Sequence, residues 1–153
     1  NSWFYKPRAL LETPYNQVCW IDADCEVLQP LDEIFNYPTN TKMALTKDLV
    51  RPMFWATGVN VIKGRPDILM RWVERCENNP KGTRGDQECL GDLIGVSDDY
   101  IVEMPQEYQW LRLMLDRGYD SSDKKIIHWT GPIGKQHIRQ RLMNESKIYT
   151  NTK

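Results

Sequence analysis

QVCWIDADCEVLQPLDEIF, residues 17–35, runs from an apolar segment into two aspartates that stand one residue apart. Its apolar start predicts a buried strand, because removing side chains such as Trp20 and Ile21 from water stabilises a fold. Asp22 and Asp24 resist burial unless they are paired or bind a cation. The pair therefore marks either the solvated end of a strand or a site that holds a ligand.

The length and composition of the chain are those of one globular domain. Of its 153 residues, 41% are hydrophobic and 27% are charged, which is typical of soluble proteins rather than disordered or membrane proteins. There are 20 basic and 21 acidic residues, so the net charge of −1 gives no reason to expect nucleic acid as a partner. No apolar run approaches the ~18 residues of a membrane span. We expect a single domain over residues 1–153, without nucleic acid and without a membrane span.

The four cysteines give no sign of a zinc site. Cys19, Cys25, Cys76 and Cys89 show no C-x-x-C spacing and no histidine placed to complete such a site. They predict free thiols in a reducing compartment, and hence a cytoplasmic protein. A disulfide between Cys76 and Cys89 is the alternative.

Strands alternate with helices along the chain. Apolar runs predict strands at 17–21, 42–46, 56–64, 100–104 and 125–129, and an extended path at 26–28. Helical spacing predicts helices at 6–12, 31–37, 66–79, 87–94 and 107–118, and a polar helix at 137–146 after a glycine loop. This alternation favours an α/β fold with a mainly parallel sheet flanked by helices.

The two aspartates lie where ligands bind in such folds. Ligands of open α/β sheets sit outside the carboxyl ends of the strands, and Asp22 and Asp24 follow the strand at 17–21. If the chain bends there, both carboxylates point to one place. Magnesium and manganese ions take oxygen ligands and keep open positions for phosphates. The pair thus predicts a cation site, with a solvated strand end as the alternative.

A second polar segment, IIHWTGPIGKQ at 126–136, lies far away in the sequence. It places His128 at the end of another predicted strand, followed by Gly131, Gly134 and Lys135 in a tight loop. Imidazole is a metal ligand, and a glycine loop that ends in lysine suits a phosphate, through backbone N–H groups and one positive charge. The alternative is a histidine at a strand end beside an ordinary Gly-Pro turn.

The segments WIDADCEVLQPLDEIF, FWATGVNVIK, GDQECLGDLI and HWTGPIGK follow one another within residues 3–136. In this order they resemble the nucleotide-sugar glycosyltransferases of the A-type fold. They are most similar to the retaining group that includes glycogenin and the bacterial lipopolysaccharide galactosyltransferases. The resemblance implies a Rossmann-like fold and transfer of a sugar from a nucleotide-diphosphate donor to a carbohydrate or lipid-linked acceptor.

The resemblance also implies roles for individual residues. Asp22, Asp24 and His128 match the ligands of a manganese or magnesium ion, which acts as a Lewis acid on the leaving diphosphate. The other matches are the donor-binding residues Thr57, Gly58, Val59, Gly131 and Lys135 and the catalytic pair Asp86 and Gln87.

One part of the family pattern is missing. Members of the family begin with strand-helix units that bind the base and ribose, whereas only a predicted helix precedes the strand at 17–21, and the first residue is Asn1. We therefore expect this chain to be the C-terminal part of a longer enzyme. The resemblance leaves open whether the chain is active on its own. An uncovered side of the sheet predicts a homo-oligomer.

Two alternatives stay open. A non-catalytic module that keeps the fold for binding or assembly is one, because loss of the base-binding half would produce it. A phosphatase of the haloacid-dehalogenase type is the other, since it also places D-x-D after an apolar strand, with Asp22 as nucleophile. That family requires threonine or valine where this chain has Glu26.

Overall fold

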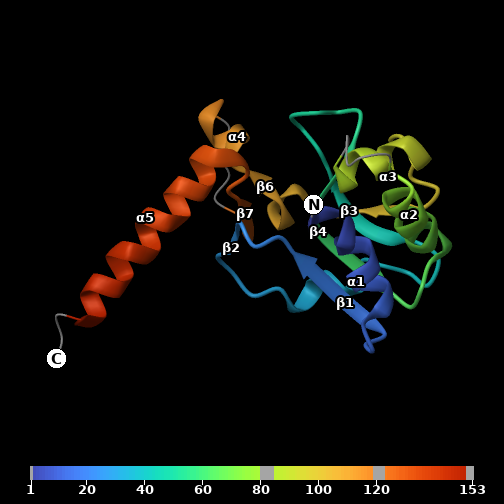
Figure 1. Ribbon diagram of the computed structural model, residues 1–153, viewed down its shortest axis with the longest axis horizontal. Helices are drawn as coiled ribbons and strands as arrows, with labels where there is room; N and C mark the ends of the chain where they lie inside the picture. The colour runs from blue at the N-terminus through green and yellow to red at the C-terminus, as the bar shows by residue number, and fades with distance from the viewer. Residues whose placement is uncertain (1, 80–84, 119–122, 151–153) are drawn as a thin grey trace.

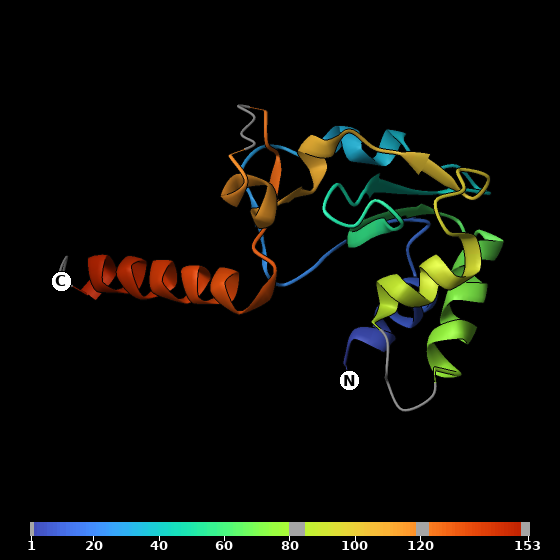
Figure 2. The ribbon, with the colours of Figure 1, turned by 90° about the horizontal axis from the view of Figure 1, so that it is seen from above.

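The computed structural model describes residues 2–79, 85–118 and 123–150. A body of strands and helices carries one long helix, α5 (Gly131–Thr150), which projects away from it (Figures 1 and 2). Among the helices of these ranges, none combines the length and the apolarity that a membrane crossing needs.

The main sheet is mixed. Its strand order is β1 (Gln17–Ile21), β4 (Trp55–Lys63), β3 (Met43–Lys47) and β5 (Ile101–Glu103). β4 runs antiparallel to both β1 and β3, whereas β3 and β5 are parallel. The α/β fold class is confirmed, but the expectation of a mainly parallel sheet is wrong. Residues 48–54, which connect β3 to β4, are too few for a crossover helix, so these two strands pair antiparallel.

A smaller sheet joins the two polar segments. Its strand order is β2 (Cys25–Val27), β7 (Ile126–His128) and β6 (Trp110–Leu111). β2 is antiparallel to β7, with Cys25 opposite His128, and β6 is parallel to β7. The Trp129 amide extends this pairing by donating to the Asp24 carbonyl at 2.8 Å. The turn after β1 and the end of β7 therefore meet at one place.

Helices form a layer on one face of the main sheet. They are α1 (Lys6–Glu12), which follows a 3₁₀ turn at Ser2–Tyr5, α2 (Asp67–Glu77) and α3 (Asp86–Ile94) (Figure 2). Trp72 of α2 is fully buried in the core under this layer. The buried residues of α2 recur at helical spacing, which is why the sequence predicts this helix well.

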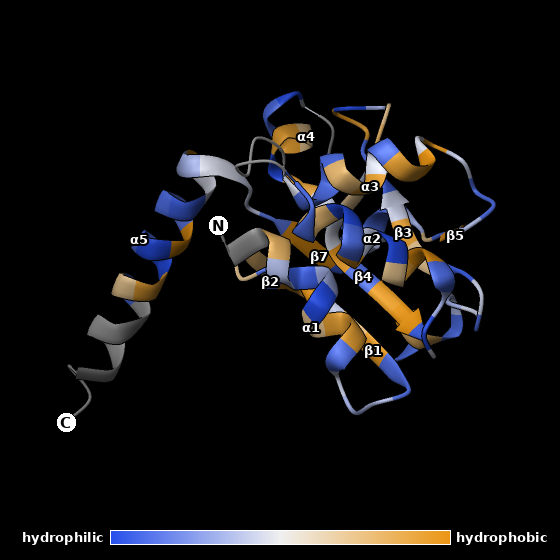
Figure 3. Ribbon diagram, turned by 45° about the vertical axis from the view of Figure 1, so that its right-hand side comes forward, coloured by the Kyte–Doolittle hydropathy of each residue, from blue (hydrophilic) through white to orange (hydrophobic). Residues whose placement is uncertain are grey.

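β4 is the most buried strand, and its two faces belong to two cores. Ile62 packs in the core beneath the helices, while Val59 and Val61 pack in a second core with Ile34 and Tyr108. The alternation follows from the two-residue repeat of a strand. β1 and β4 are accordingly among the most hydrophobic segments of the body (Figure 3).

Residues 107–118 do not form the single helix that we expected. The segment divides into a 3₁₀ turn, η4 (Gln106–Tyr108), then β6, then the short helix α4 (Arg112–Asp116). Gln109 is not helical, with a φ of −153° and a ψ of 74°, and the two residues of β6 pair with β7. Pairing in the sheet thus overrides the helical spacing of the apolar residues. The predicted helix at 31–37 is likewise only a 3₁₀ turn, η2 (Asp32–Asn36).

The expected glycine loop at 130–135 is wrong, because α5 already begins at Gly131. Pro132 fits the first turn of a helix, where its missing N–H has no partner to lose. A Cβ on Gly134 would lie 2.0 Å from the Trp129 carbonyl oxygen, so this glycine allows the helix to pack closely on the preceding chain. The four cysteines are free thiols, as expected.

Candidate functional site

The chain turns sharply after β1, and this turn aims the two aspartates. The Asp22 amide donates to the Gly58 carbonyl at 2.8 Å, and the Cys25 amide donates back to the Asp22 carbonyl at 3.0 Å. Both carboxylates are partly buried, with 24% of the Asp22 side chain and 18% of the Asp24 side chain exposed. The aspartates therefore line a site instead of ending a strand in open solvent.

His128 lies against both aspartates although 104 residues separate it from Asp24 in the chain. Its Nε2 is 3.0 Å from Asp24 Oδ1 and 4.0 Å from Asp22 Oδ2. Pairing of β2 with β7 brings the three side chains together. The structure thus gathers the three predicted metal ligands in one place, while their role in binding a metal stays a prediction.

The surroundings of Asp24 favour its charged form. Burial by itself would raise the pKa of Asp24, but the hydrogen bond with His128 and the charges of His128 and Lys135 outweigh it and hold the pKa below the ordinary 3.8. Lys135 Nζ is 4.0 Å from Asp24 Oδ2, and its side chain is 51% exposed. Lys135 therefore stands at the rim of the site.

The donor set fits a hard divalent cation. Ligand atoms of Asp24, Cys25 and His128 lie within 4.8 Å of one another. Burial raises the pKa of the Cys25 thiol far above its ordinary 9.0, so this thiol stays protonated and is a poor ligand. The carboxylate oxygens of Asp22 and Asp24 suit manganese or magnesium, with the His128 imidazole as a third group.

Lys6 belongs to the site although the sequence did not point to it. Its Nζ contacts Asp22 Oδ1 at 2.9 Å and Asp86 Oδ2 at 2.8 Å, and it donates to the Thr57 carbonyl at 2.9 Å. Burial by itself would lower the pKa of Lys6, but the two carboxylates outweigh it and raise the pKa above 10.5. A lysine at the start of a helix gives no signal of such burial in the sequence.

The predicted catalytic pair begins α3 and lies beside the predicted sugar segment of β4. Thr57 Oγ1 donates to Asp86 Oδ2 at 3.1 Å, and the Trp72 indole N–H donates to the Asp86 carbonyl at 2.8 Å. Gln87 Nε2 donates to Asp48 Oδ2 at 2.8 Å, a partner that the sequence also did not reveal. Asp86 is thus fixed next to Lys6, and Gln87 is anchored by the turn after β3.

Gly58 leaves room for His128. A Cβ on Gly58 would lie 2.5 Å from His128 Nδ1 and 2.8 Å from Gln109 Nε2. The next amide, that of Val59, donates to Gln109 Oε1 at 2.8 Å. Gly131 is the first residue of α5, with a φ of +80°, and so lies in a helix and not in the expected loop.

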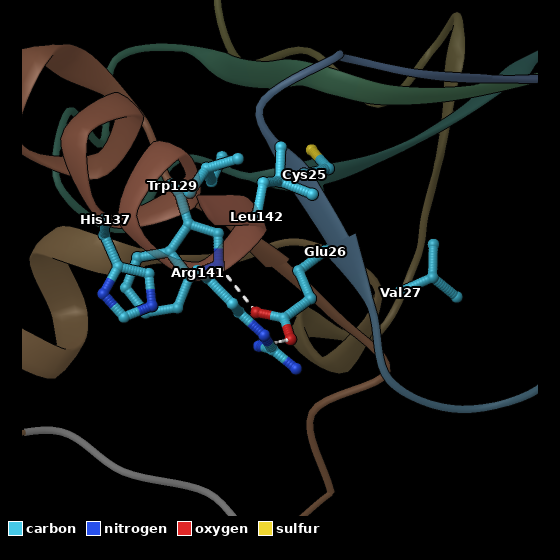
Figure 4. A pocket seen from close by; sticks show the side chains of 8 residues that line it. Cys25, Glu26, Val27, Trp129, His137, Arg141 and Leu142 are labelled. Atoms are coloured by element: carbon cyan, nitrogen blue, oxygen red, sulfur yellow. Dashed lines mark hydrogen bonds and ion pairs between the residues drawn. The ribbon is translucent and has the colours of Figure 1, made fainter. Parts of the chain in front are cut away.

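A groove of about 290 Å³ adjoins the site at Cys25 and lies between β2 and the first turns of α5. In it, the Trp129 indole N–H donates to Glu26 at 2.9 Å, and Arg141 also pairs with Glu26 (Figure 4). His137 stacks on Trp129 with ring centres 4.0 Å apart. The polar groups of this groove satisfy one another, in contrast to the open rim at Lys135.

No protein-family model matches the chain, and no curated protein sequence matches it. Solved structures do match. The glycosyltransferase GlyE of Streptococcus pneumoniae TIGR4 superposes with a TM-score of 0.63 and 17% identity, over 84% of this chain and 37% of GlyE. The galactosyltransferase LgtC, determined with donor and acceptor sugar analogues, gives 0.59 and 16%, over 84% of this chain and 58% of LgtC.

A third match, mouse xyloside xylosyltransferase 1, has a TM-score of 0.54 and 11% identity, over 82% of this chain and 62% of that enzyme. The chain thus spans less than two thirds of the length of these three proteins. At identities this low, the superpositions establish the fold alone. The chemistry has to be argued from the site. The chain has the Rossmann-like fold of the A-type glycosyltransferases, as its four motifs imply.

Proposed function

We propose that this chain is a metal-dependent glycosyltransferase domain, which moves a sugar from a nucleotide-diphosphate donor to a carbohydrate or lipid-linked acceptor. The convergence of Asp22, Asp24 and His128 beside Lys6 and Asp86 carries the proposal. Such a gathering of titratable groups, at strand ends in a sugar-transferase fold, suits the binding of a charged donor.

Asp24, Asp22 Oδ2 and His128 would hold the manganese or magnesium ion. When bound, this ion supplies Lewis-acid stabilisation of the negative charge on the leaving diphosphate. Asp22 Oδ1 has no lone pair left for a cation, because it accepts from the Trp20 indole N–H at 2.7 Å and pairs with Lys6. Lys135, which is half exposed at the rim, is free to turn its ammonium toward the diphosphate.

The sugar lies, in this proposal, between β4 and the start of α3. Thr57, Gly58 and Val59 provide backbone close to it, and Asp86 and Gln87 flank its reacting carbon. Lys6 and Asp48 hold the two α3 side chains in place from either side. A fixed geometry of this kind reduces the entropy that the reaction has to lose.

The test is calorimetry with uridine, guanosine and adenosine diphosphates, in manganese and in excess chelator. We expect one of the nucleotides to bind with manganese and to lose most of its affinity with chelator, because a diphosphate otherwise meets Asp22 and Asp24 unscreened. Asp24→Asn should remove the manganese-dependent part. Equal affinity with and without chelator contradicts the metal-bridged site.

A second assay separates an enzyme from a binding module with the same fold. Sugar nucleotides of the base that binds are incubated with the protein and manganese, and released nucleoside diphosphate is measured. Release that Asp86→Asn abolishes supports transfer or donor hydrolysis, whereas binding without release supports the non-catalytic alternative. The three solved structures compared above are glycosyltransferases, and no described residue of the site favours a phosphatase.

Two further parts of the proposal concern the whole molecule. β1 lies at the end of the strand order of the main sheet, so its outer backbone groups suit pairing with a second copy of the chain, and a homo-oligomer stays a prediction. The four free thiols support a reducing compartment, which we propose is the cytoplasm.

A further inference from the structure

Gln109 is buried beside the candidate metal site, and the orientation of its amide is fixed by the backbone. Only 1% of the residue is exposed. Its Oε1 accepts the Val59 N–H at 2.8 Å, and because an amide N–H can only donate, the oxygen must be the atom that faces it. Gln109 Nε2 is therefore the atom that faces His128 Nδ1, at 3.4 Å.

This orientation restricts where His128 carries its proton. Gln109 Nε2 is a donor, so a neutral imidazole meets it favourably only with an unprotonated Nδ1. The proton then sits on Nε2, from which it is donated to Asp24 Oδ1 at 3.0 Å. Gln109 on one side of the ring and Asp24 on the other thus select the same tautomer.

A metal ligand needs the opposite tautomer. A histidine that binds a cation through Nε2 carries its proton on Nδ1, and it donates this proton to a carboxylate, a carbonyl or water. In this chain Nδ1 faces a donor instead. The ring cannot move away freely, because the Gly58 backbone lies against both His128 and the Gln109 amide.

We propose that Gln109 is a positioning residue that keeps His128 protonated on Nε2 and thereby weakens cation binding at Asp24 and His128. The inference rests on the proposed function, and it adds a residue that sets the affinity of the site. Binding through Nε2 requires the proton to move to Nδ1 and the contact with Gln109 Nε2 to break. The carboxylates of Asp22 and Asp24 then supply most of the binding free energy of the cation.

Gln109→Glu is the decisive variant. A glutamate has nearly the same shape and still accepts the Val59 N–H, but its second oxygen accepts a proton from Nδ1. The chain has two histidines, so a His137→Gln background leaves His128 as the one imidazole in nitrogen NMR spectra. In the metal-free protein we expect a proton on Nε2 alone with Gln109, and a proton on Nδ1 with Gln109→Glu.

Manganese affinity gives the second measurement, and a double-mutant cycle separates the hydrogen bond from the added charge. With His128 present, Gln109→Glu should raise the affinity about tenfold, the effect typical of partners that orient a metal ligand. In a His128→Ala background the same substitution should change it less than about twofold. An equal gain in both backgrounds means that only charge acts, and it overturns the inference.

The metal-free spectra decide the inference separately from the proposed function. A proton on Nδ1 with Gln109 intact, or no proton on Nδ1 in a folded Gln109→Glu protein, overturns it. If neither protein binds manganese, the proposed function fails, and the tautomer in the two metal-free spectra still decides whether Gln109 controls His128.

Discussion

Two groups of polar and charged side chains meet at Asp22 and differ in how completely their members are paired. The Lys6 cluster consists of Lys6, Asp22, Asp86 and Thr57, and the His128 cluster of Asp24, His128 and Lys135. Lys6 has three partners within 2.9 Å and a side chain that is 6% exposed, whereas Lys135 stands 4.0 Å from its partner and is 51% exposed.

The difference separates a cluster that stabilises the fold from a cluster that has groups left to bind a ligand. The Lys6 cluster has its ammonium fully paired in a buried place, so it fixes the start of α3 against β4. The His128 cluster keeps lone pairs of the Asp24 carboxylate and the exposed ammonium of Lys135 available for a ligand. Substitution of Lys6 should therefore reduce stability above all, whereas substitutions of Asp24, His128 or Lys135 should reduce binding.

Lys6→Met should have the largest effect on stability. It removes the cation between Asp22 and Asp86 and leaves two carboxylates facing each other, and breaking a buried ion pair in this way typically costs about 3–5 kcal/mol. Urea unfolding followed by circular dichroism measures the loss. Lys135→Met is the matched control, with an expected change within about 0.5 kcal/mol. Similar values for the two lysines contradict the division between the clusters.

Gly58→Ala should affect both stability and binding. Its Cβ would lie 2.5 Å from His128 Nδ1 and 2.6 Å from Cε1, so the ring has to shift. Overpacking of this kind costs about 1–3 kcal/mol, and displacement of His128 from Asp24 should lower manganese affinity about tenfold. Gly85→Ala is the control, because among the described residues its Cβ meets the far end of the long Glu88 side chain. Unchanged manganese affinity in a folded Gly58→Ala protein would show that the His128 position does not matter.

An element could be predicted from the sequence where the hydrophobic pattern of that segment alone determines whether it forms a strand or a helix. The apolar run of β4 and the helical spacing of α2 and α3 gave elements within a few residues of those observed. Strand direction was missed, because it depends on the length of the connection at 48–54 and not on the strands themselves. Residues 107–118 were missed because the strand pairing of Trp110 and Leu111 comes from β7.

The site shows the same limit. Asp22, Asp24 and His128 can be named from the sequence because each stands at a predicted strand end and matches a motif of the family that the chain resembles. The structure brings the three side chains together, and their role as metal ligands stays a prediction. Lys6 and Gln109 act through partners that are 16 or more residues away, and neither stands in a motif. A buried lysine cannot be told from a surface lysine until its two carboxylates are placed around it.

Asp24→Asn should abolish manganese binding and should cause a small loss of stability at neutral pH. The asparagine oxygen still accepts the His128 proton, but the charge is lost. The pKa of Asp24 lies below its unfolded value of about 3.8. Its stabilising contribution is therefore present above that pH and disappears as the pH falls through the folded pKa. Stability curves of the two proteins should run parallel from pH 5 to 8 and converge in acid, and a gap that widens in acid contradicts the sign of the shift.

Lys135→Met should have the smallest effect. The side chain is half exposed and 4.0 Å from Asp24, so its loss should barely change stability and should not prevent manganese binding. An exposed charge contributes about 0.2–1 kcal/mol, which corresponds to about a 1.4- to fivefold loss of affinity for the manganese-diphosphate ligand. Because salt screens such a charge, the loss measured by calorimetry should shrink as the salt concentration rises. Arg139→Met, an exposed cation further along α5, is the control and should leave affinity unchanged. If Lys135→Met instead removes binding as completely as Asp24→Asn, the lysine is part of the metal site itself, and its place at the rim does not describe the bound state.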